Sequence, residues 1–196
     1  MLKITSLFKS YISGKYILKD INFEFTFPKK YVIEGPNGSG KSTLIGIIGG
    51  YLNKDSGTIE ITQKQQNNII DTTCINNYID IVSPYIDYPE ELNLKEIVEL
   101  LYINEKELIP ILLTKLQFDA KLKYKNLSSG MKQKFKILTG LISNKPIVIF
   151  DEPCIFLDNT GEKWFFEEIN KLNKLIIFTE SKKLHEDKKI TIKKYI

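Results

Sequence analysis

A glycine-rich segment that directly follows a short apolar run is the feature that most constrains this chain. The apolar run, Tyr31-Val32-Ile33, has the character of a buried strand. Behind it stands the segment Gly35-Pro36-Asn37-Gly38-Ser39-Gly40-Lys41-Ser42-Thr43, and then apolar residues recur with helical spacing at Leu44, Ile45, Ile47, Ile48 and Tyr51. The spacing Gly35-x4-Gly40-Lys41-Ser42 fits the phosphate-loop pattern, in the strand–loop–helix context that the pattern requires.

The residue types in this segment predict that it binds a nucleotide. Glycines allow successive backbone N–H groups to converge on phosphate oxygens, a geometry that a Cβ would obstruct. A helix that begins near Lys41 directs its positive end at the same anion. We expect Lys41 to add a point charge for the β- and γ-phosphates and Ser42 to offer its hydroxyl to Mg²⁺. The predicted nucleotide-binding residues are therefore Gly35, Pro36, Asn37, Gly38, Ser39, Gly40, Lys41, Ser42 and Thr43.

Two carboxylates follow a second buried strand. Ile147–Phe150 is a continuous apolar run, as expected of a strand covered on both faces, and Asp151 and Glu152 come directly after it. On their own they would be solvated charges at a strand end. With a phosphate loop upstream, the carboxyl end of a parallel sheet is where nucleotide binds. We predict that Asp151 holds Mg²⁺ and that Glu152 orients and polarises the attacking water.

Strand and helix patterns alternate along the rest of the chain. We predict strands at 21–27, 57–62, 79–82, 175–178 and 190–192, helices within 95–141 and over 164–172, and a loop or edge segment at 63–77. This order predicts an α/β fold with a mainly parallel sheet. The whole chain, 1–196, is expected to form one domain with a helical insert at about 84–141.

Composition excludes several classes of protein. At 42% hydrophobic and 27% charged residues the chain is neither disordered nor a membrane protein, and no apolar stretch approaches the roughly 20 residues that cross a bilayer. Two cysteines are too few for a disulfide framework, which favours a reducing compartment. The net charge of +4 comes from a lysine-rich, arginine-free composition, so we expect no nucleic-acid partner.

Three further motifs identify a family. Leu127-Ser128-Ser129-Gly130-Met131 resembles the LSGGQ signature of ATP-binding cassette (ABC) ATPases, Asp151-Glu152-Pro153 resembles their Walker B ending, and Leu157-Asp158 resembles their D-loop. A Ser-Ser-Gly turn that caps a helix would be the ordinary explanation of the signature alone. The order phosphate loop, helical insert, signature, Walker B and D-loop is that of this family. The resemblance implies a P-loop NTPase fold of the ABC type, with N-terminal antiparallel strands and a short inserted helical subdomain.

The same resemblance implies how the site is completed. Two subunits are expected to pair head to tail around two ATP molecules, so that the signature residues Ser128, Ser129 and Gly130 meet the γ-phosphate bound by the partner. Asp158 is expected to communicate across that interface. The family stacks an aromatic side chain on adenine. Tyr11 is the predicted residue, with Phe8 and Tyr16 as competitors.

The sequence also departs from the family at two positions. Ser83-Pro84 stands where the Q-loop glutamine, which reaches Mg²⁺ and the attacking water, is expected. Thr179-Glu180-Ser181 stands where the switch histidine is expected, and the single histidine, His185, lies five positions later and is interpreted as a surface residue. These changes leave open how fast the chain hydrolyses ATP.

The leading hypothesis is the ATP-hydrolysing subunit of an ABC transporter, with ATP and Mg²⁺ as its cofactors. It would work as a homodimer or heterodimer on a separate integral membrane subunit, peripheral to the cytoplasmic side of the inner or plasma membrane. Two alternatives remain. One is a soluble ABC ATPase with an assembly role of the iron–sulfur type. The other is a slow or non-hydrolysing nucleotide-binding module, because both the glutamine and the histidine are replaced.

Overall fold

The structure is a computed structural model that describes residues 1–63, 66–70, 75, 77–115, 118–181 and 190–195. His185 lies outside the described residues, as do several residues of the predicted loop at 63–77. The chain divides into two compact units. Residues 1–81, 145–151 and 173–196 form the two-sheet unit, and residues 82–144 and 152–172 form the helical unit.

An antiparallel sheet opens the two-sheet unit. Its strand order is β2-β1-β4-β5, from β1 (Leu2–Ile12), β2 (Lys15–Phe25), β4 (Ser56–Gln63) and β5 (Gln66–Ile70). All three pairings are antiparallel, as the fold class predicted for the N-terminal strands. The strand predicted at 21–27 in fact begins at Lys15, and β1 was not predicted.

The second sheet carries the phosphate loop. Its order is β6-β7-β8-β3-β9, from β3 (Lys30–Glu34), β6 (Ile79–Val82), β7 (Ile147–Phe150), β8 (Leu175–Glu180) and β9 (Thr191–Tyr195). β7 pairs in parallel with β8, and β8 pairs in parallel with β3. β9 runs antiparallel along the other side of β3. The loop therefore leaves the sheet from an interior strand.

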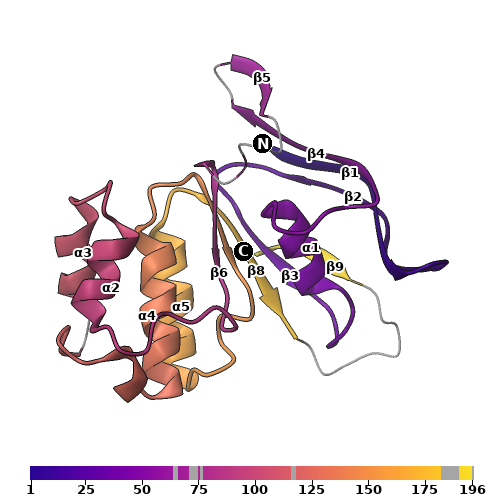
Figure 1. Ribbon diagram of the computed structural model, residues 1–196. Helices are drawn as coiled ribbons and strands as arrows, with labels where there is room; N and C mark the ends of the chain where they lie inside the picture. Colours follow the sequence, from indigo (N-terminus) through magenta and orange to yellow (C-terminus); the bar gives the residue numbers. More distant parts are fainter. Residues whose placement is uncertain (64–65, 71–74, 76, 116–117, 182–189, 196) are drawn as a thin grey trace. The chain divides into compact units, whose positions relative to one another are not determined.

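Helix α1 (Lys41–Ile48) lies between the two sheets (Figure 1). Its apolar residues share one buried core with side chains from both sheets, among them Ile4, Leu18, Ile33, Ile59, Ile149 and Ile177. Burial of apolar surface on both sides fixes the helix at the end of β3. The start of α1 is consequently held beside the carboxyl ends of β3, β7 and β8.

The helical unit contains α2 (Leu94–Leu101), α3 (Leu108–Lys115), α4 (Ser129–Ile142) and α5 (Asn159–Lys171), with a short 3-10 helix over Tyr124–Asn126. α5 begins five residues before the predicted start at Trp164. The core of this unit gathers Leu94, Ile97, Leu112, Tyr124 and Phe135 among others. Figure 1 shows α4 and α5 side by side, in agreement with their contacts.

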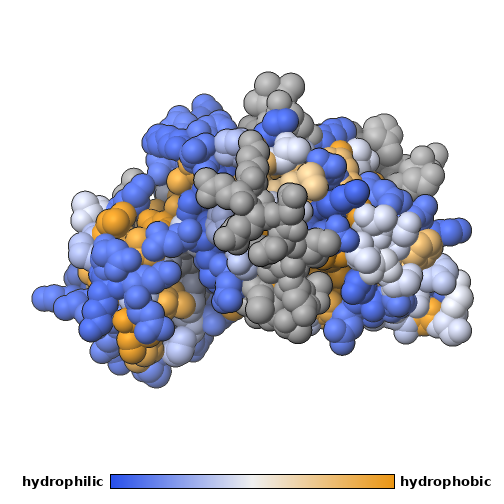
Figure 2. Space-filling model, turned by 90° about the horizontal axis from the view of Figure 1, so that it is seen from above, coloured by the Kyte–Doolittle hydropathy of each residue, from blue (hydrophilic) through white to orange (hydrophobic). Residues whose placement is uncertain are grey.

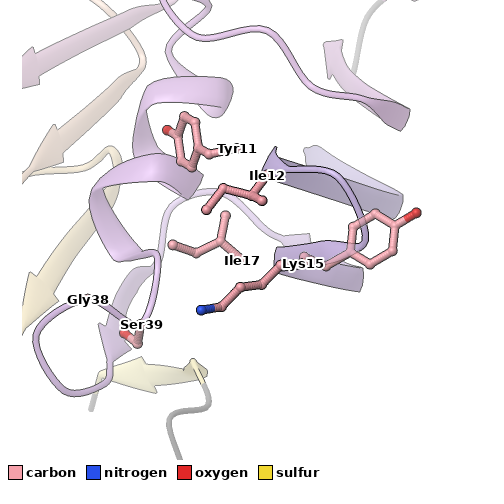
Figure 3. A pocket seen from close by; sticks show the side chains of 7 residues that line it. Tyr11, Ile12, Lys15, Ile17, Gly38 and Ser39 are labelled. Carbon is pink, nitrogen blue, oxygen red and sulfur yellow. The ribbon is translucent and has the colours of Figure 1, made fainter.

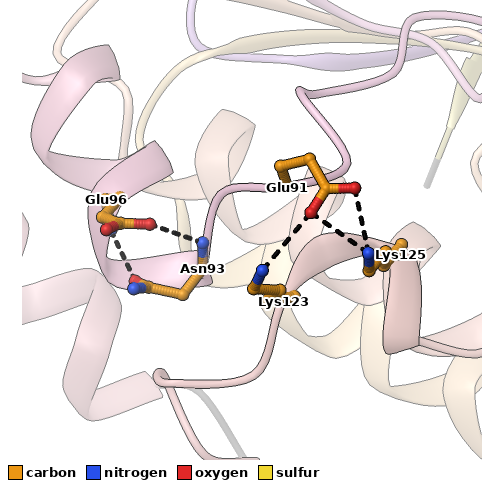
Figure 4. A network of polar contacts seen from close by, with 5 residues as sticks. All are labelled: Glu91, Asn93, Glu96, Lys123 and Lys125. Carbon is orange, nitrogen blue, oxygen red and sulfur yellow. Dashed lines mark hydrogen bonds and ion pairs between the residues drawn. The ribbon is translucent and has the colours of Figure 1, made fainter.

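A polar network fixes the segment that leads into α4 (Figure 4). Asn93 and Glu96 form a capping box at the start of α2, in which each side chain accepts a hydrogen bond from the backbone N–H of the other residue. Glu91 accepts hydrogen bonds from Lys123 at 3.3 Å and from Lys125 at 2.9 Å. These contacts tie the start of α2 to the residues just before Leu127.

Candidate functional site

The loop between β3 and α1 has a backbone that needs glycine at two positions. Gly38 has φ +77° and Gly40 has φ +99°, both in the left-handed region that side chains disfavour. A Cβ on Gly40 would also lie 3.0 Å from Ile17 Cγ1. Gly40 precedes the first residue of α1, so the loop directs the N-terminal N–H groups of the helix into its own concavity.

Lys41 places a buried positive charge inside this loop. Its side chain is 5% exposed. The Nζ atom donates to the carbonyl oxygens of Gly35 at 2.8 Å and Pro36 at 3.2 Å. An ammonium that is removed from water in this way needs polar partners, which the loop's own main chain provides. The arrangement concentrates positive potential where an anion would approach.

Ser39 places a buried hydroxyl in the same loop. Its side chain is 5% exposed, and within the described part of the chain its Oγ is the one buried side-chain polar atom without a hydrogen-bond partner. Buried hydroxyls are normally paired, because an unpaired one costs about 1–3 kcal/mol. A phosphate oxygen at this loop would supply the partner. This observation fits a nucleotide to residues 35–43.

Asp151 lies at the end of β7, next to the end of β8. The register that pairs Phe150 with Phe178 brings the following residues together, and Thr179 Oγ1 donates to Asp151 Oδ1 at 2.8 Å. Both side chains are buried. Partial burial, together with the negative charge of Asp151, raises the pKa of Tyr51. A buried carboxylate and the hydroxyl of Ser42 are oxygen ligands of the kind that Mg²⁺ prefers, so these residues fit the ion.

A pocket of about 360 Å³ opens beside the loop (Figure 3). Its lining residues are Tyr11, Ile12, Lys15, Tyr16, Ile17, Gly38 and Ser39. The Tyr11 hydroxyl shares a hydrogen bond of 3.3 Å with Thr43 Oγ1, which joins the β1 end to α1. Phe8, one predicted competitor for adenine, is not among the lining residues and packs edge-on against Tyr16. The pocket offers an aromatic and apolar wall next to the phosphate loop.

Lys15 is a residue of this pocket that the sequence motifs do not mark. It is the first residue of β2, directly after the turn at 13–14, and Figure 3 shows its side chain extending toward the loop at Ser39. A second cation at the mouth of the pocket adds to the potential that Lys41 creates. A lysine next to glycine in a hairpin turn is too ordinary a pattern to be noticed in a lysine-rich sequence.

The remaining predicted residues belong to the helical unit. Glu152 has φ +45°, an unusual backbone conformation for a residue with a side chain. Ser128 is the N-cap of α4, where its Oγ accepts from the Met131 N–H at 3.2 Å. Asp158 is the N-cap of α5 and accepts from the Gly161 N–H at 2.7 Å. Ser129 is exposed, and a Cβ on Gly130 would lie 3.2 Å from the Phe156 carbonyl oxygen.

The structure describes both positions at which the sequence departs from the family pattern, Ser83 and Glu180. Ser83 follows β6 directly, is buried, and accepts from the Tyr85 N–H at 3.3 Å. Glu180 is the last residue of β8, with an exposed side chain and a carbonyl oxygen that accepts from the Gly35 N–H at 3.4 Å. A carboxylate therefore ends the strand next to β3.

A protein-family model described as "ABC transporter" matches residues 18–155, which is more than half of the chain. The chain belongs to the ABC transporter family. It carries one ABC ATPase cassette, and the match confirms the family, the fold class and the ATPase activity predicted from the motifs. No described helix of this cassette has the length and apolar character needed to span a membrane.

Curated relatives and solved structures agree with this assignment. The lantibiotic transport ATP-binding protein SrtF of Streptococcus pyogenes is 35% identical over 163 residues, which are 82% of this chain and 70% of SrtF. The energy-coupling factor transporter ATP-binding protein EcfA1 of Fusobacterium nucleatum is 30% identical over 194 residues, 88% of this chain and 69% of EcfA1. The dimeric post-hydrolysis structure of the ATP-binding cassette MJ0796, bound to ADP and Pi, superposes with a TM-score of 0.76 at 26% identity and covers 93% of this chain and 88% of that one.

Proposed function

We propose that this ABC ATPase binds MgATP at the phosphate loop, dimerises around two ATP molecules, and uses their hydrolysis to drive a separate membrane subunit. The partner cassette is an identical or a related copy. The site of action is the cytoplasmic face of the inner or plasma membrane. The unpartnered buried hydroxyl of Ser39, in a loop built around Gly38 and Gly40, is the observation that carries the proposal.

Binding is assigned to the two-sheet unit. The loop N–H groups and Lys41 neutralise the β- and γ-phosphates, and Ser39 donates its unused hydroxyl hydrogen to a phosphate oxygen. Ser42 and Asp151 hold Mg²⁺, which supplies charge stabilisation for the phosphates when bound. Tyr11 stacks on adenine in the pocket beside the loop, with Tyr16 on the same wall.

Hydrolysis is assigned to Glu152. Its carboxylate accepts a proton from a water molecule while the water oxygen bonds to the γ-phosphorus and the bond from that phosphorus to the bridging oxygen breaks. ADP and inorganic phosphate leave, and the proton passes from Glu152 to solvent. Positioning of the water and stabilisation of the negative charge account for most of the acceleration in phosphoryl transfer.

The signature contacts come from the partner cassette. α4 has no acidic residue in its first turn, so the positive end of the helix is not neutralised by its own side chains. The hydrogen bond that Ser128 Oγ accepts from Met131 leaves the hydroxyl's own hydrogen to donate. Ser128, Ser129 and Gly130 therefore suit a γ-phosphate held by another copy. Asp158, at the start of α5, is proposed to sense the same interface.

The helical unit offers a surface for a protein partner. Leu92, Leu100, Ile103 and Ile109 line a groove of about 630 Å³ along α2 and α3. Leu100 and Ile103 are among the large hydrophobic residues with more than half of their surface exposed. Figure 2 shows hydrophobic patches, in orange, among hydrophilic side chains, in blue, on the face of the molecule that it presents. Exposed apolar surface is typical of interaction sites.

ATP-dependent dimerisation tests the proposal. In light scattering, the Glu152→Gln variant with MgATP is expected to run at twice the mass that it has without nucleotide, because it binds ATP but does not cleave it. Lys41→Ala is the control that is expected to remain a monomer. Nucleotide binding by Lys41→Ala at the parent affinity would contradict the assignment of the loop. Purification without any integral membrane subunit would favour the assembly role instead.

A further inference from the structure

The loop after β6 replaces the family glutamine by Ser83, a side chain too short to reach as far. Two residues later, Tyr85 reaches the catalytic carboxylate. The Tyr85 hydroxyl donates to Glu152 Oε2 at 3.4 Å, and both residues belong to the helical unit. The Tyr85 side chain is 71% exposed. Packing into a core therefore does not explain why its hydroxyl lies at Glu152.

We propose that Tyr85 is a positioning residue for Glu152, supplied by the loop in which the family is expected to have its glutamine. The inference rests on the proposed role of Glu152 as the base. A hydrogen bond to one carboxylate oxygen fixes the rotation of the carboxylate about its last side-chain bond. The tyrosine ring has few rotatable bonds, so it holds this geometry at a lower entropic cost than a flexible side chain. The second oxygen, the proposed acceptor of the water proton, is thereby held in one orientation.

The backbone on both sides of Tyr85 is fixed. Ser83 Oγ accepts from the Tyr85 N–H at 3.3 Å, and the Ser83 carbonyl oxygen accepts from the Ile86 N–H at 3.3 Å. The Pro84 carbonyl oxygen accepts from Lys136 Nζ at 2.7 Å. Ser83 therefore has a structural role of its own, because its hydroxyl stabilises the turn from which Tyr85 projects.

The buried side chain of Lys136 anchors the end of the same segment. Its Nζ atom lies 2.8 Å from Asp87 Oδ1, and the Tyr124 hydroxyl donates to the same oxygen at 2.9 Å. The hydrogen bonds from Lys136 and Tyr124 lower the pKa of Asp87, although partial burial opposes them. The loop from Ser83 to Asp87 is therefore joined to α4 at two points.

Helix α4 also holds the segment that contains Glu152. The buried Gln133 donates from Nε2 to the Pro153 carbonyl oxygen at 2.8 Å, and the Ile155 N–H donates to the Glu152 carbonyl oxygen at 3.2 Å. Gln133 and Lys136 are three residues apart, so they lie on one face of the helix. One rigid helix consequently sets the distance between Tyr85 and Glu152. The same helix carries Ser128 at its N-cap.

Removal of the tyrosine hydroxyl tests the inference. The assay is hydrolysis by the full-length chain, measured as steady-state phosphate release and in single turnovers with enzyme in excess, so that slow rates are detected. Tyr85→Phe is expected to lower kcat about tenfold, the scale of one hydrogen bond to a charged group. KM for ATP is expected to stay at the parent value, because Tyr85 contacts the proposed base and is not one of the residues proposed to bind the phosphates.

Tyr88→Phe is the matched control. It removes a tyrosine hydroxyl from the same segment, and that hydroxyl shares a 3.3 Å hydrogen bond with Thr139 Oγ1. It is expected to hydrolyse ATP at the parent rate. Any residual single-turnover rate of Glu152→Gln is expected to be unchanged when Tyr85→Phe is added, because the two residues act as one unit.

Three results would overturn the inference: parent turnover or faster turnover by Tyr85→Phe, a change in KM without a change in kcat, or an equal loss in Tyr88→Phe. The proposed function fails separately. If Glu152→Gln hydrolyses ATP at the parent rate, the base is wrongly assigned. If Glu152→Gln is inactive while Tyr85→Phe matches the parent, the base stands and only the role of Tyr85 is wrong.

Discussion

Thr179 Oγ1 donates a 2.8 Å hydrogen bond to Asp151 Oδ1, and both side chains are buried at the carboxyl ends of neighbouring parallel strands. The contact fixes one oxygen of the carboxylate that is proposed to hold Mg²⁺. It also keeps a hydroxyl directly before Glu180, which stands where relatives are expected to have histidine.

Thr179→Val replaces the hydroxyl by a methyl group of similar shape and removes this donor. We expect a loss of about 1–2 kcal/mol in the free energy of unfolding, because the buried carboxylate loses one of its hydrogen bonds. The Mg²⁺ concentration needed for half-maximal ATP binding is expected to rise. Denaturant unfolding and nucleotide titrations at several Mg²⁺ concentrations measure the two effects. Thr179→Ser keeps the hydroxyl and is the control; equal behaviour of both variants would contradict the role of this hydrogen bond.

Ser39→Ala is expected to act in opposite directions on the free and the nucleotide-bound protein. In the free protein it removes a buried hydroxyl that has no partner, so stability is expected to stay the same or rise by about 1 kcal/mol. ATP affinity is expected to fall, because the donor for a phosphate oxygen is lost. Thermal melts with and without MgATP measure both. The exposed Ser56→Ala is the control, and a drop in the stability of the free Ser39→Ala protein would refute the argument.

Ser83→Gln restores the residue type that the family has at this position, yet we expect it to slow hydrolysis. Ser83 is buried, and its hydroxyl holds the Tyr85 N–H. A larger side chain there removes that hydrogen bond and displaces the turn that presents Tyr85. Phosphate release by the purified chain measures the effect. Faster turnover would mean instead that the native serine limits the site.

The pair of Asp87 and Lys136 predicts an acid-sensitive helical unit. In the unfolded chain the pKa of an Asp carboxyl is about 3.9, and in the folded protein the hydrogen bonds from Lys136 and Tyr124 lower the pKa of Asp87. The folded state therefore binds fewer protons. Its extra stability is present above about pH 4 and is lost as the pH falls through the folded pKa.

Asp87→Asn isolates this contribution. It is expected to melt at a lower temperature than the parent at pH 7, because it leaves the buried Lys136 without a charged partner. The difference is expected to shrink as the pH falls below about 4 and through the lowered pKa of folded Asp87, because the parent carboxyl then becomes protonated. Circular dichroism melts at pH 7 and pH 3 compare the two proteins. A difference that stays constant across this range would rule out titration of Asp87 as the cause.

The continuous apolar runs were sufficient to predict the strands at the centre of the fold. The prediction at 147–150 coincides with β7, because a strand covered on both faces leaves no polar residue to obscure its ends. The prediction at 79–82 coincides with β6, an edge strand that contains Asp80 and that Pro84 follows closely. β1 was missed for the opposite reason. Leu2 and Ile4 are buried at alternate positions, but Ser6 has φ +45° and the register shifts before Leu7, so the period of two breaks.

Helix starts were harder to predict than helix interiors. The prediction for α5 began at Trp164, where apolar residues first recur, while the helix begins at Asn159 with a mostly exposed first turn. Asp158, the N-cap residue of α5, was the sequence signal for this helix start, but the motif predicts it only as a D-loop residue. Its hydrogen bond to the Gly161 N–H serves the helix locally, whatever else the residue does.

Within the candidate site, residues that belong to a motif of fixed sequence spacing could be predicted. Contacts between residues far apart in the sequence could not. The loop at 35–43 has a local pattern that reflects its chemistry. Tyr85 meets Glu152 across 67 positions, and Thr179 meets Asp151 across 28. Only the pairing of strands and the packing of α4 create these neighbours.

Strand β9 has a consequence for how the protein is made. It pairs with β3 from Thr191 opposite Glu34 to Tyr195 opposite Lys30, and Lys193 donates to Glu34 at 2.7 Å. The other neighbour of β3 is β8, which also comes late in the chain. During translation, about 140 residues must be added after β3, the strand that precedes the phosphate loop, before either of its neighbouring strands has been synthesised. A nascent chain still short of residue 175 is expected to lack both strands that flank this loop's strand, and to gain nucleotide affinity only after β8 and β9 have been synthesised.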